Sequence, residues 1–517
     1  MINLDNFSLL TLYEMLEQTA AKYPNQVAVI DGEIKLSYSE LKETIDAFAS
    51  VLYEKGIQKG DRIGLMLPNG IHYMISYYAT QRLGGIVVQV NPLYQTSELQ
   101  YMLDDANPKL FICGRNQAEK LEKIEDFENV HVIFTKDESN KDQILLKGKN
   151  CTLPPLNINP NEDVAVLQYT GGTTGRSKGV MLTHFNIISN IHQSGSVVSS
   201  VMKEGEERIL GVAPLTHAMA MTNMNYTVRF AATYIIVEKF EVTKVLQTIS
   251  QYKPTMMLGS PTMYIALLNH PNLGKNDLSC FKICISGSAP LPVEVLKELE
   301  RKSGAHIFEG YGLSEATTST HRTPVDGERK IGSVGIPVPL TESKIVDIET
   351  GTRELATGER GELIVKGPQV MKGYWNKSVE TALTIRDGWL YTGDIAVRDK
   401  DGYYYIVGRK KDMVIAGGLN IYPAEVEEML YQHPAIAEAC VFGVPDAYLG
   451  EKLLAIVILK QGENISEQEL LSWCEGRIAR YKIPRAIEFR EALPKTIVGK
   501  ILRRRLVEEY KEKLNQL

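Results

Sequence analysis

The sequence predicts an α/β protein with a large N-terminal domain of parallel sheets and helices, a small β-rich subdomain, and a separate α+β domain at the C-terminal end. Short apolar runs alternate with helical patterns in residues 60–115, and further apolar runs recur between residues 207 and 290. The texture then changes near residue 331 and again near residue 408. A chain of 517 residues also exceeds what one hydrophobic core usually holds, so several domains are expected.

The first part of the chain provides the helices and strands of the large domain. Residues 1–24 have apolar residues at helical spacing and lack the basic start and continuous apolar core of a signal peptide, so we expect an amphipathic helix. Strand-like runs at 61–69 and 84–92 are separated by a helical stretch that ends at Leu83, which is typical of βαβ units. The later runs end in Gly, Ser or Pro, as expected for buried parallel strands with functional loops at their carboxyl ends.

Two changes of texture predict the domain boundaries. Residues 331–408 consist of short strands and turns, which indicates a β-rich subdomain at the end of a large domain spanning 1–408. Residues 409–517 contain a helical pattern, apolar strands, a second helical pattern at 467–481 and a basic tail. A length of about one hundred residues suits an independent domain.

Composition excludes several classes of protein. The net charge of −6 gives no electrostatic reason to expect a nucleic-acid partner. The six cysteines are scattered without CxxC pairs, so they are interpreted as free thiols in a reducing, cytoplasmic compartment. Because no apolar run reaches the length that spans a bilayer, we expect no integral membrane segment; peripheral membrane contact remains open.

The most informative segment is YTGGTTGRSKG, residues 169–179. Its four glycines allow backbone conformations closed to other residues, and its threonines and backbone N–H groups are donors suited to a polyphosphate. The segment is not the P-loop of nucleotide triphosphatases, which needs GxxxxGK followed by Ser or Thr, because Lys178 follows Gly175 at three residues. A loop of this kind alone would be weak support for phosphate binding.

Further motifs accompany this loop. They are EGYGLSEAT (309–317), GELIVKGPQVMKGY (361–374), GWLYTGD (388–394), GRKKDMVIAGGLNIYPAEVE (408–427) and PKTIVGKILRR (494–504). Together they resemble the adenylate-forming (ANL) superfamily, and among bacterial members the medium- and long-chain fatty acyl-CoA ligases. The resemblance runs from about Leu36 to Arg505 and implies that the C-terminal domain is mobile.

The resemblance implies an ATP-dependent acyl-CoA ligase. Such enzymes join a carboxylic acid to AMP with release of pyrophosphate and then transfer the acyl group to CoA. The implied cofactors are ATP and Mg²⁺, with CoA as co-substrate and a medium- or long-chain fatty acid as the expected acid. Two positions depart from the family pattern: Gly171 stands where many members have serine, and Ser177 where many have proline.

The resemblance also assigns nucleotide-binding residues. Those expected to hold the β- and γ-phosphates are Thr170, Gly171, Gly172, Thr173, Thr174, Gly175 and Lys178. Those expected around the adenine, the acyl group and the α-phosphate are Ser288, Ala289, Glu309, Gly310, Tyr311, Gly312 and Ser314. Glu315 would hold Mg²⁺. Asp394, which has no obvious local partner in the sequence, would accept both ribose hydroxyls, and Arg409 would share that contact.

Residues of the C-terminal domain complete the implied mechanism. Lys500 would be the catalytic lysine that bridges the acyl carboxylate and the α-phosphate. In the family the domain then rotates about a hinge, here Lys411, and brings Gly417 and Gly418 to the channel for the pantetheine arm. The basic run at 503–505 is interpreted first as the solvated face of a helix and second as a contact for CoA phosphates.

His217 and the methionines near it have two interpretations. A lone histidine after a buried strand is usually a satisfied core residue, but family members place a gating residue between the carboxylate site and the CoA tunnel at this position. Ala218 follows where amino-acid-activating relatives keep an aspartate, which argues against amino-acid substrates. The methionines suit either a pocket for apolar chains or ordinary packing, and they are Met219, Met221, Met224, Met256, Met257 and Met263.

Alternatives remain at this stage. The enzyme could deliver the acyl group to an acyl carrier protein, although the compact stretch between 388–394 and 408–412 shows no insertion of the kind such ligases carry. It could also act on aryl or other small acids. A luciferase-type oxygenase shares every motif without specific support, and a non-catalytic nucleotide-binding regulator would be expected to have lost Lys500, Glu315 or Asp394. Both a monomer and a homodimer fit the sequence.

Overall fold

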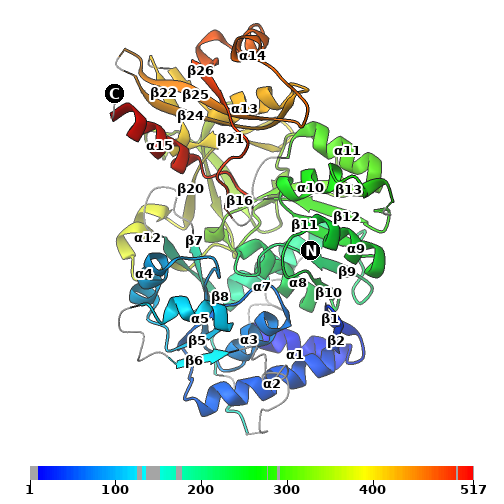
Figure 1. The fold of residues 1–517 in the computed structure, drawn as a ribbon. Coiled ribbons are helices and arrows are strands. Elements are labelled where there is room, and N and C mark those ends of the chain that lie inside the picture. Colours follow the sequence, from blue (N-terminus) through cyan, green and yellow to red (C-terminus); the bar gives the residue numbers. More distant parts are fainter. Residues whose placement is uncertain are drawn as a thin grey trace.

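A computed structural model describes residues 10–124, 131–134, 152–155, 157–170, 177–275, 278–287, 291–417, 419–446, 448–496 and 499–515. The large domain contains two sheets covered by helices, and a third, antiparallel sheet lies between them and the C-terminal domain (Figure 1). The α/β fold class is therefore confirmed. The C-terminal domain, coloured orange to red, lies across one end of the molecule near α10 (Pro261–Leu268) and α11 (Val293–Ser303).

The first sheet carries most of the strands that lead into the site. In spatial order its strands are β15 (Ile336–Pro337), β14 (His321–Arg322), β13 (His306–Tyr311), β12 (Ile283–Ser286), β11 (Met256–Gly259), β9 (Arg208–Gly211), β10 (Thr233–Ile236), β1 (Val27–Asp31) and β2 (Ile34–Ser37). The central strands from β13 to β1 pair in parallel, whereas β2, β14 and β15 are antiparallel additions. Strands β9 to β12 are buried along nearly their whole length, as the continuous apolar runs predict.

The second sheet begins at the N-terminal half and ends at the glycine-rich segment. Its order is β18 (Gly373–Tyr374), β8 (Lys178–Thr183), β7 (Val164–Thr170), β4 (Ile86–Gln89), β3 (Arg62–Met66), β5 (Leu110–Cys113) and β6 (His131–Phe134). The predicted βαβ units are confirmed, since β3, β4 and β5 pair in parallel. The helices around the two sheets are α1 (Leu12–Lys22), α2 (Tyr38–Glu54), α3 (Ile71–Arg82), α4 (Thr96–Ala106), α5 (Arg115–Leu121), α7 (His184–Val197), α8 (Ala218–Arg229) and α9 (Val242–Tyr252).

The expected β-rich region forms the third sheet, with two exceptions. Strands β16 (Glu342–Val346), β17 (Arg360–Lys366), β20 (Trp389–Arg398) and β19 (Ile385–Arg386) are joined by β21 (Tyr404–Arg409), which pairs with β20. The exceptions are β15, which pairs with β14 of the first sheet, and β18, which pairs with β8 of the second sheet and is followed by α12 (Ser378–Thr384). The β-rich segment therefore also closes the edge of the sheet that carries the glycine-rich loop.

The C-terminal domain packs helices against its own sheet. The strands are β23 (Leu419–Ile421), β22 (Val414–Ala416), β25 (Gly450–Leu459), β24 (Ile436–Asp446) and β26 (Ala486–Phe489), and the helices are α13 (Pro423–Tyr431), α14 (Glu467–Cys474) and α15 (Arg503–Asn515). The prediction of one helix over 467–481 is wrong. The helix ends at Cys474 because Glu475 is extended and Gly476 has a φ of +75°, which a helix does not accept.

Ion pairs join the two domains near their predicted boundary. Arg360 on β17 pairs with Glu425 on α13 at 2.6 Å, and its guanidinium stacks 5.6 Å from the centre of the Tyr422 ring. Lys482 pairs with the same Glu425 at 2.5 Å. The boundary at residue 408 itself stays a prediction. Within the described ranges, no helix has the length and apolar character needed to cross a membrane.

Candidate active site

The candidate site lies where several strands end and the C-terminal domain meets the large domain. The carboxyl ends of parallel strands share one edge of a sheet, so the segments after β9, β12 and β13 come together there. The antiparallel pair β20–β21 and the loop that carries Lys500 complete the site from the side of the C-terminal domain. Residues separated by almost 300 positions in the chain therefore meet at one place.

The glycine-rich segment connects two neighbouring antiparallel strands. Thr170 at the end of β7 lies opposite Lys178 at the start of β8, and the Ser177 hydroxyl donates to the Thr170 carbonyl. Several predicted site residues lie outside the described residues: Gly171, Gly172, Thr173, Thr174, Gly175, Ser288, Ala289 and Gly418. The two described ends of the segment nevertheless place Lys178 at the first position of β8, directly after the glycine-rich segment.

Lys178 and Glu315 lie on either side of Tyr374. The Lys178 ammonium is 4.8 Å from the centre of the Tyr374 ring, and the Tyr374 hydroxyl donates to Glu315 Oε1 at 2.8 Å. Burial, followed by the Glu315 charge, raises the pKa of Tyr374 well above its usual range, so the phenol stays a donor at neutral pH. A cation and a carboxylate are thus held apart by a neutral ring.

The surroundings of Glu315 fit a magnesium ion bound through phosphate. Glu315 lies in a single 3-10 turn, Ser314–Ala316, and its main-chain oxygen accepts from Met371 N at 2.8 Å. One carboxylate oxygen takes the Tyr374 hydroxyl, and the other has no protein donor among the contacts of the described residues. Mg²⁺ typically uses one or two carboxylates and completes its shell with water and substrate phosphates. The described part of the chain contains no cluster of three metal-ligating side chains, which fits that mode of binding.

The turn after Glu315 is held in a rare backbone conformation. Thr317 has a φ of +61° and a ψ of −64°, and Thr318 N donates to Ala316 O at 2.6 Å, which makes a tight γ-turn. The turn carries the Thr318 carbonyl against Gly312, where a side-chain carbon would overlap it. Glycine is therefore required at 312. The strained Thr317 turn directly follows the segment that carries Glu315, so the strain lies within the candidate site.

The Asp394 carboxylate has two partners, and both come from segments distant in the sequence. Its Oδ2 accepts from the Tyr311 hydroxyl at 2.5 Å, and its Oδ1 lies 3.3 Å from Arg409 Nε. Asp394 and Arg409 are direct cross-strand neighbours on β20 and β21. Tyr311 comes from the end of β13 in the first sheet, so Asp394 links the first and third sheets.

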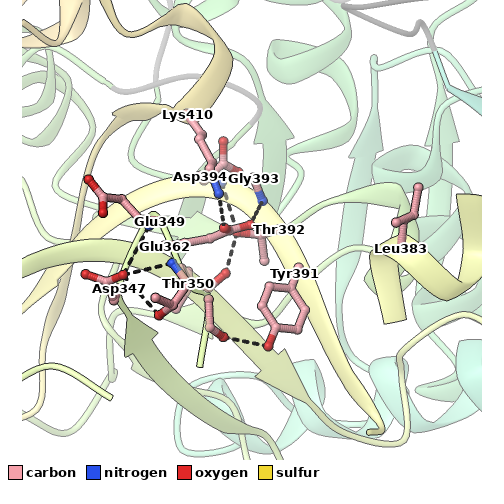
Figure 2. Close-up of polar contacts among 12 residues, drawn as sticks. Asp347, Glu349, Thr350, Glu362, Leu383, Tyr391, Thr392, Gly393, Asp394 and Lys410 are labelled. Carbon is pink, nitrogen blue, oxygen red and sulfur yellow. Dashed lines mark hydrogen bonds and ion pairs between the residues drawn. The ribbon is translucent and has the colours of Figure 1, made fainter. Parts of the chain in front are cut away.

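The turn before Asp394 is itself fixed by polar contacts. Gly393 N donates to Glu362 Oε1 at 3.2 Å, and Asp394 N donates to Thr392 Oγ1 at 3.1 Å (Figure 2). Lys410 pairs with the second Glu362 oxygen at 2.9 Å. Since Glu362 is buried and fully partnered, the Asp394 carboxylate is held in one orientation before any ligand binds.

Glu309 has a carboxyl that becomes largely uncharged below neutral pH. Burial is the main cause that raises the pKa of its carboxyl to about 7, and the donation from Leu291 N at 3.2 Å only partly opposes that rise. A neutral carboxylic acid can donate as well as accept a hydrogen bond. Glu309 therefore differs from Glu315 and Asp394, for which a charged state suits the expected role.

Lys500 reaches the large domain. Burial, followed by the Arg409 charge, lowers the pKa of its ammonium to about 8, and the Asp394 charge partly opposes that shift. The preceding Gly499 lies against Ser260 and Thr262, at the start of α10. The structure thus brings Lys500 together with Asp394 and Arg409, as the resemblance implied for adenylation.

His217 begins helix α8. Its Nδ1 accepts from Met219 N at 3.3 Å, so a neutral imidazole carries its proton on Nε2. Burial, and secondarily the Lys500 charge, lowers the pKa of His217 to about 4. His217 is consequently a neutral group near Lys500 and caps a helix, which is compatible with both interpretations made from the sequence.

The methionines lie within the hydrophobic cores. Met219, Met221, Met224 and Met256 belong to the main core, and Met257 and Met263 to the core under α9, α10 and α11. Met219 also approaches Gly287, the last described residue before the loop that contains Ser288 and Ala289. Its Sδ lies 3.3 Å from the position that a Cβ atom would take at Gly287. Met219 is the one of these for which a contact at the site is observed.

In the C-terminal domain, Arg503 contradicts its sequence interpretation. Its guanidinium contacts Asp412 Oδ2 at 2.9 Å, Glu427 Oε1 at 2.6 Å and the Val441 carbonyl at 2.9 Å, so it is not a solvated charge. Arg504 is exposed and pairs with Glu508. Gly417 has a φ of +59°, a conformation that favours glycine.

Sequence reasoning missed three polar residues at or near the site. Tyr374 ends the motif 361–374 and Glu362 lies within it, but no periodicity assigns them to Glu315 and Asp394. Arg322 lies beyond the motif 309–317 on β14, with its side chain beside Gly310. In the sequence, Arg322 is marked only as an arginine in a segment rich in threonine, residues 317–323.

Comparisons with known proteins place the chain among adenylating enzymes. The family described as AMP-binding enzyme matches residues 16–375, and the AMP-binding enzyme C-terminal domain matches residues 425–500. The chain is 45% identical to a long-chain-fatty-acid–CoA ligase of Bacillus subtilis (strain 168), covering 97% of this chain and 95% of the relative. It is 36% identical to the Escherichia coli O6:H1 ligase of the same name, covering 99% and 97%.

Solved structures agree over the whole chain. ATP-bound MatB from Rhodopseudomonas palustris has a TM-score of 0.89 at 31% identity, covering 97% of this chain and 99% of that one. The apo form of MatB, with the same identity and coverage, has a lower TM-score of 0.78. O-succinylbenzoate coenzyme A synthetase from Bacillus subtilis, in complex with ATP and magnesium ion, has a TM-score of 0.84 at 29% identity, covering 96% and 99%.

Proposed function

Because this chain belongs to the AMP-binding enzyme family, we propose that it is an ATP-dependent acyl-CoA ligase that converts a fatty acid to its acyl-CoA through an acyl-adenylate. The relatives that match over nearly their full length are named long-chain-fatty-acid–CoA ligases, which supports both the reaction and the class of acid. The observation that carries the proposal is that Lys500, beside α10 of the large domain, lies near enough to Asp394 and Arg409 for their charges to change the pKa of its ammonium.

In the first step an oxygen of the substrate carboxylate attacks the α-phosphorus of ATP, and the bond to pyrophosphate breaks. The Lys500 ammonium would neutralise the two anions that must approach each other. Asp394, fixed by Tyr311 and Thr392, would accept the ribose hydroxyls. Lys178 would hold the leaving phosphates.

Mg²⁺ would be held by Glu315 and by phosphate oxygens, and it would supply charge neutralisation for the leaving pyrophosphate. Tyr374 keeps one Glu315 oxygen occupied, so the other is the free ligand. ATP and Mg²⁺ are observed together in the related O-succinylbenzoate synthetase.

In the second step the CoA thiolate attacks the acyl carbonyl carbon, and the bond to AMP breaks. The closer match to ATP-bound than to apo MatB supports an adenylation arrangement for this structure, so the C-terminal domain must move for the thiol to enter. Lys411 would be the hinge, and Gly417 and Gly418 would line the pantetheine channel. The neutral His217 would separate the carboxylate site from that channel.

The proposal is tested by following pyrophosphate release and acyl-CoA formation across a panel of fatty acids, with and without CoA. Sustained turnover that needs CoA in the wild type and is lost in Lys500→Ala is expected. Release of a single equivalent of pyrophosphate, unaffected by CoA, would instead indicate delivery to a carrier-protein thiol. Retention of full adenylation by Lys500→Ala would contradict the role of the lysine.

A further inference from the structure

Arg322 carries a positive charge into the interior without an acidic partner. Its Nε and Nη2 both donate to one hydroxyl, Ser319 Oγ, at 3.2 and 3.1 Å. Among the described residues no carboxylate lies within ion-pair distance of its guanidinium. A guanidinium has five donors, and an enclosed cation usually has a carboxylate partner, so this arrangement leaves binding capacity unused.

The acidic group that, like Arg322, acts on Tyr226 is already paired. The Glu207 charge raises the pKa of the Tyr226 phenol, and the Arg322 charge lowers it. Glu207 Oε1, however, pairs with Lys282 at 2.6 Å and accepts from Lys203 N at 2.8 Å. Tyr226 is thus close to both groups, while only Arg322 keeps an unpaired charge. An internal ion pair does not explain why the arginine is there.

The Arg322 side chain lies beside Gly310 of β13. Arg322 is the cross-strand neighbour of Gly310, and its Cγ lies 3.5 Å from the position that a Cβ atom would take at that glycine. Glycine at 310 thereby leaves room for the arginine side chain. Tyr311, the next residue, alternates to the opposite side and donates to Asp394 at the nucleotide site.

The segment before Arg322 follows α8 away from the reacting centre. Thr318 contacts Ala218 and Thr222 in the first turns of the helix. Further along the helix, the Arg322 charge lowers the pKa of Tyr226. Tyr226 lies nine positions after His217, which corresponds to about 13 Å along a helix. An extended acyl chain advances about 1.3 Å per carbon, so roughly ten carbons cover that distance.

The arginine also keeps accessible surface deep in the molecule. His217, Tyr311 and Arg322 are each partly accessible, although burial lowers the pKa of His217 to about 4 and that of Arg322 to about 10. Helix α8, in contrast, is buried over its whole length up to Val228. Arg322 therefore keeps some exposed surface, whereas the helix that its segment follows is enclosed.

We propose that Arg322 forms a distal anion subsite, which selects an acid with a second carboxylate at the far end of a medium-length chain. The subsite rests on the proposed ligase function, since the first carboxylate is placed at Lys500. Ser319 Oγ holds one N–H each of Nε and Nη2, and the remaining N–H groups of Nη1 and Nη2 can bind the distal carboxylate. Ser319 is itself held by Asn190 of α7, whose amide group bonds both its N–H and its carbonyl.

The test compares acids of equal length that differ only in the distal group: octanoate with octanedioate, and dodecanoate with dodecanedioate. The values of kcat/KM for CoA-dependent pyrophosphate release are measured for wild type, Arg322→Leu and Arg322→Lys. We expect the wild type to prefer the diacids by about tenfold or more, and Arg322→Leu to lose about 30-fold on diacids while keeping or improving its activity on monoacids. Arg322→Lys should retain part of the preference, because it keeps the charge but not the planar fork.

Arg229→Leu is the matched control, because this arginine ends α8 but contacts His192 and the Phe230 ring. It should leave the diacid preference unchanged. A wild type that prefers monoacids, or an Arg322→Leu variant that loses equally on both classes, would overturn the subsite.

Direct binding separates this inference from the ligase proposal. Calorimetry of dodecanedioate and dodecanoate with wild-type protein, in the presence of a non-hydrolysable ATP analogue, needs neither CoA turnover nor a folded variant. Tighter binding of the diacid supports the subsite even if turnover with CoA fails, and equal or weaker binding contradicts it even if the ligase activity is present.

Discussion

Gly499 lies directly against Thr262, so the residue before Lys500 is in contact with the first turn of α10. A Cβ atom at position 499 would overlap the Thr262 hydroxyl and lie 3.4 Å from Ser260 Oγ. The glycine also has a φ of +78°. Both features restrict this position to glycine. The contact joins the C-terminal domain to the large domain at the point where Lys500 enters the site.

Gly499→Ala should therefore impair adenylation selectively. The added methyl group keeps Lys500 from its docked position, and a displacement of about 1 Å at a reacting group can cost roughly 100-fold in rate. We expect pyrophosphate release to fall by that order, while the transfer of a supplied acyl-adenylate to CoA stays near the wild-type rate. Rapid-quench measurement of the two half-reactions separates them.

The control for this variant is Gly476→Ala. Gly476 has a similar φ of +75°, but a side-chain carbon there would meet no atom within 4 Å. It reports the backbone strain alone and should leave adenylation nearly unchanged. Equal losses of adenylation in both variants would show that strain, not contact with Thr262, explains the effect.

The hydrogen bond from Tyr311 to Asp394 leads to a second prediction. In Tyr311→Phe the carboxylate loses its 2.5 Å donor and becomes free to reorient, so ATP binding should weaken by roughly tenfold. Calorimetry with ATP measures the dissociation constant. Tyr391→Phe is the matched control, since its hydroxyl donates to Gly351 O, away from Asp394 (Figure 2). Similar weakening in both variants would argue against Asp394 as the ribose acceptor.

A third prediction concerns the stability of the C-terminal domain. Arg503 joins α15 to Asp412 and Glu427, and Arg503→Met would leave two partly buried carboxylates without their cation. Because all three side chains keep some exposure, we expect a loss of about 1–3 kcal/mol in the free energy of unfolding. Arg504→Met removes only an exposed pair with Glu508 and should cost about 0.5 kcal/mol or less.

Chemical denaturation followed by tryptophan fluorescence measures both variants, because Trp473 lies in α14 of the same domain. Equal stability of Arg503→Met and wild type would contradict a structural role.

Much of the fold could be predicted from the sequence, because burial leaves a local pattern. The runs that became β9, β11 and β12 are mostly apolar since both faces of their sheet are covered. The helix over 467–481 failed because one glycine, Gly476, takes a positive φ that a periodicity argument does not register.

The candidate site was predicted less completely. The resemblance nominated Lys500, Asp394 and Arg409, and the structure brings them together. The partners that orient such groups come from distant segments: Tyr311 is 83 residues from Asp394, and Tyr374 is 59 residues from Glu315. Local patterns do not encode contacts at these separations, which depend on how the sheets pack.

The pH dependence of adenylation follows from the environment of Lys500. Burial lowers the pKa of its ammonium to about 8, with Arg409 and Lys411 adding to the shift, so the free enzyme loses the charged form as pH rises through that value. We therefore expect kcat/KM for pyrophosphate release to decline above about pH 8. Bound ATP brings negative charge to the lysine and raises its pKa, so the decline in kcat should occur at higher pH than the decline in kcat/KM. In Lys411→Met one repelling cation is removed, and the decline in kcat/KM should move to higher pH. Pyrophosphate release measured between pH 6 and 10 in the two proteins decides the matter. A decline that stays in place in Lys411→Met, or that moves to lower pH, would show that a group other than Lys500 controls it.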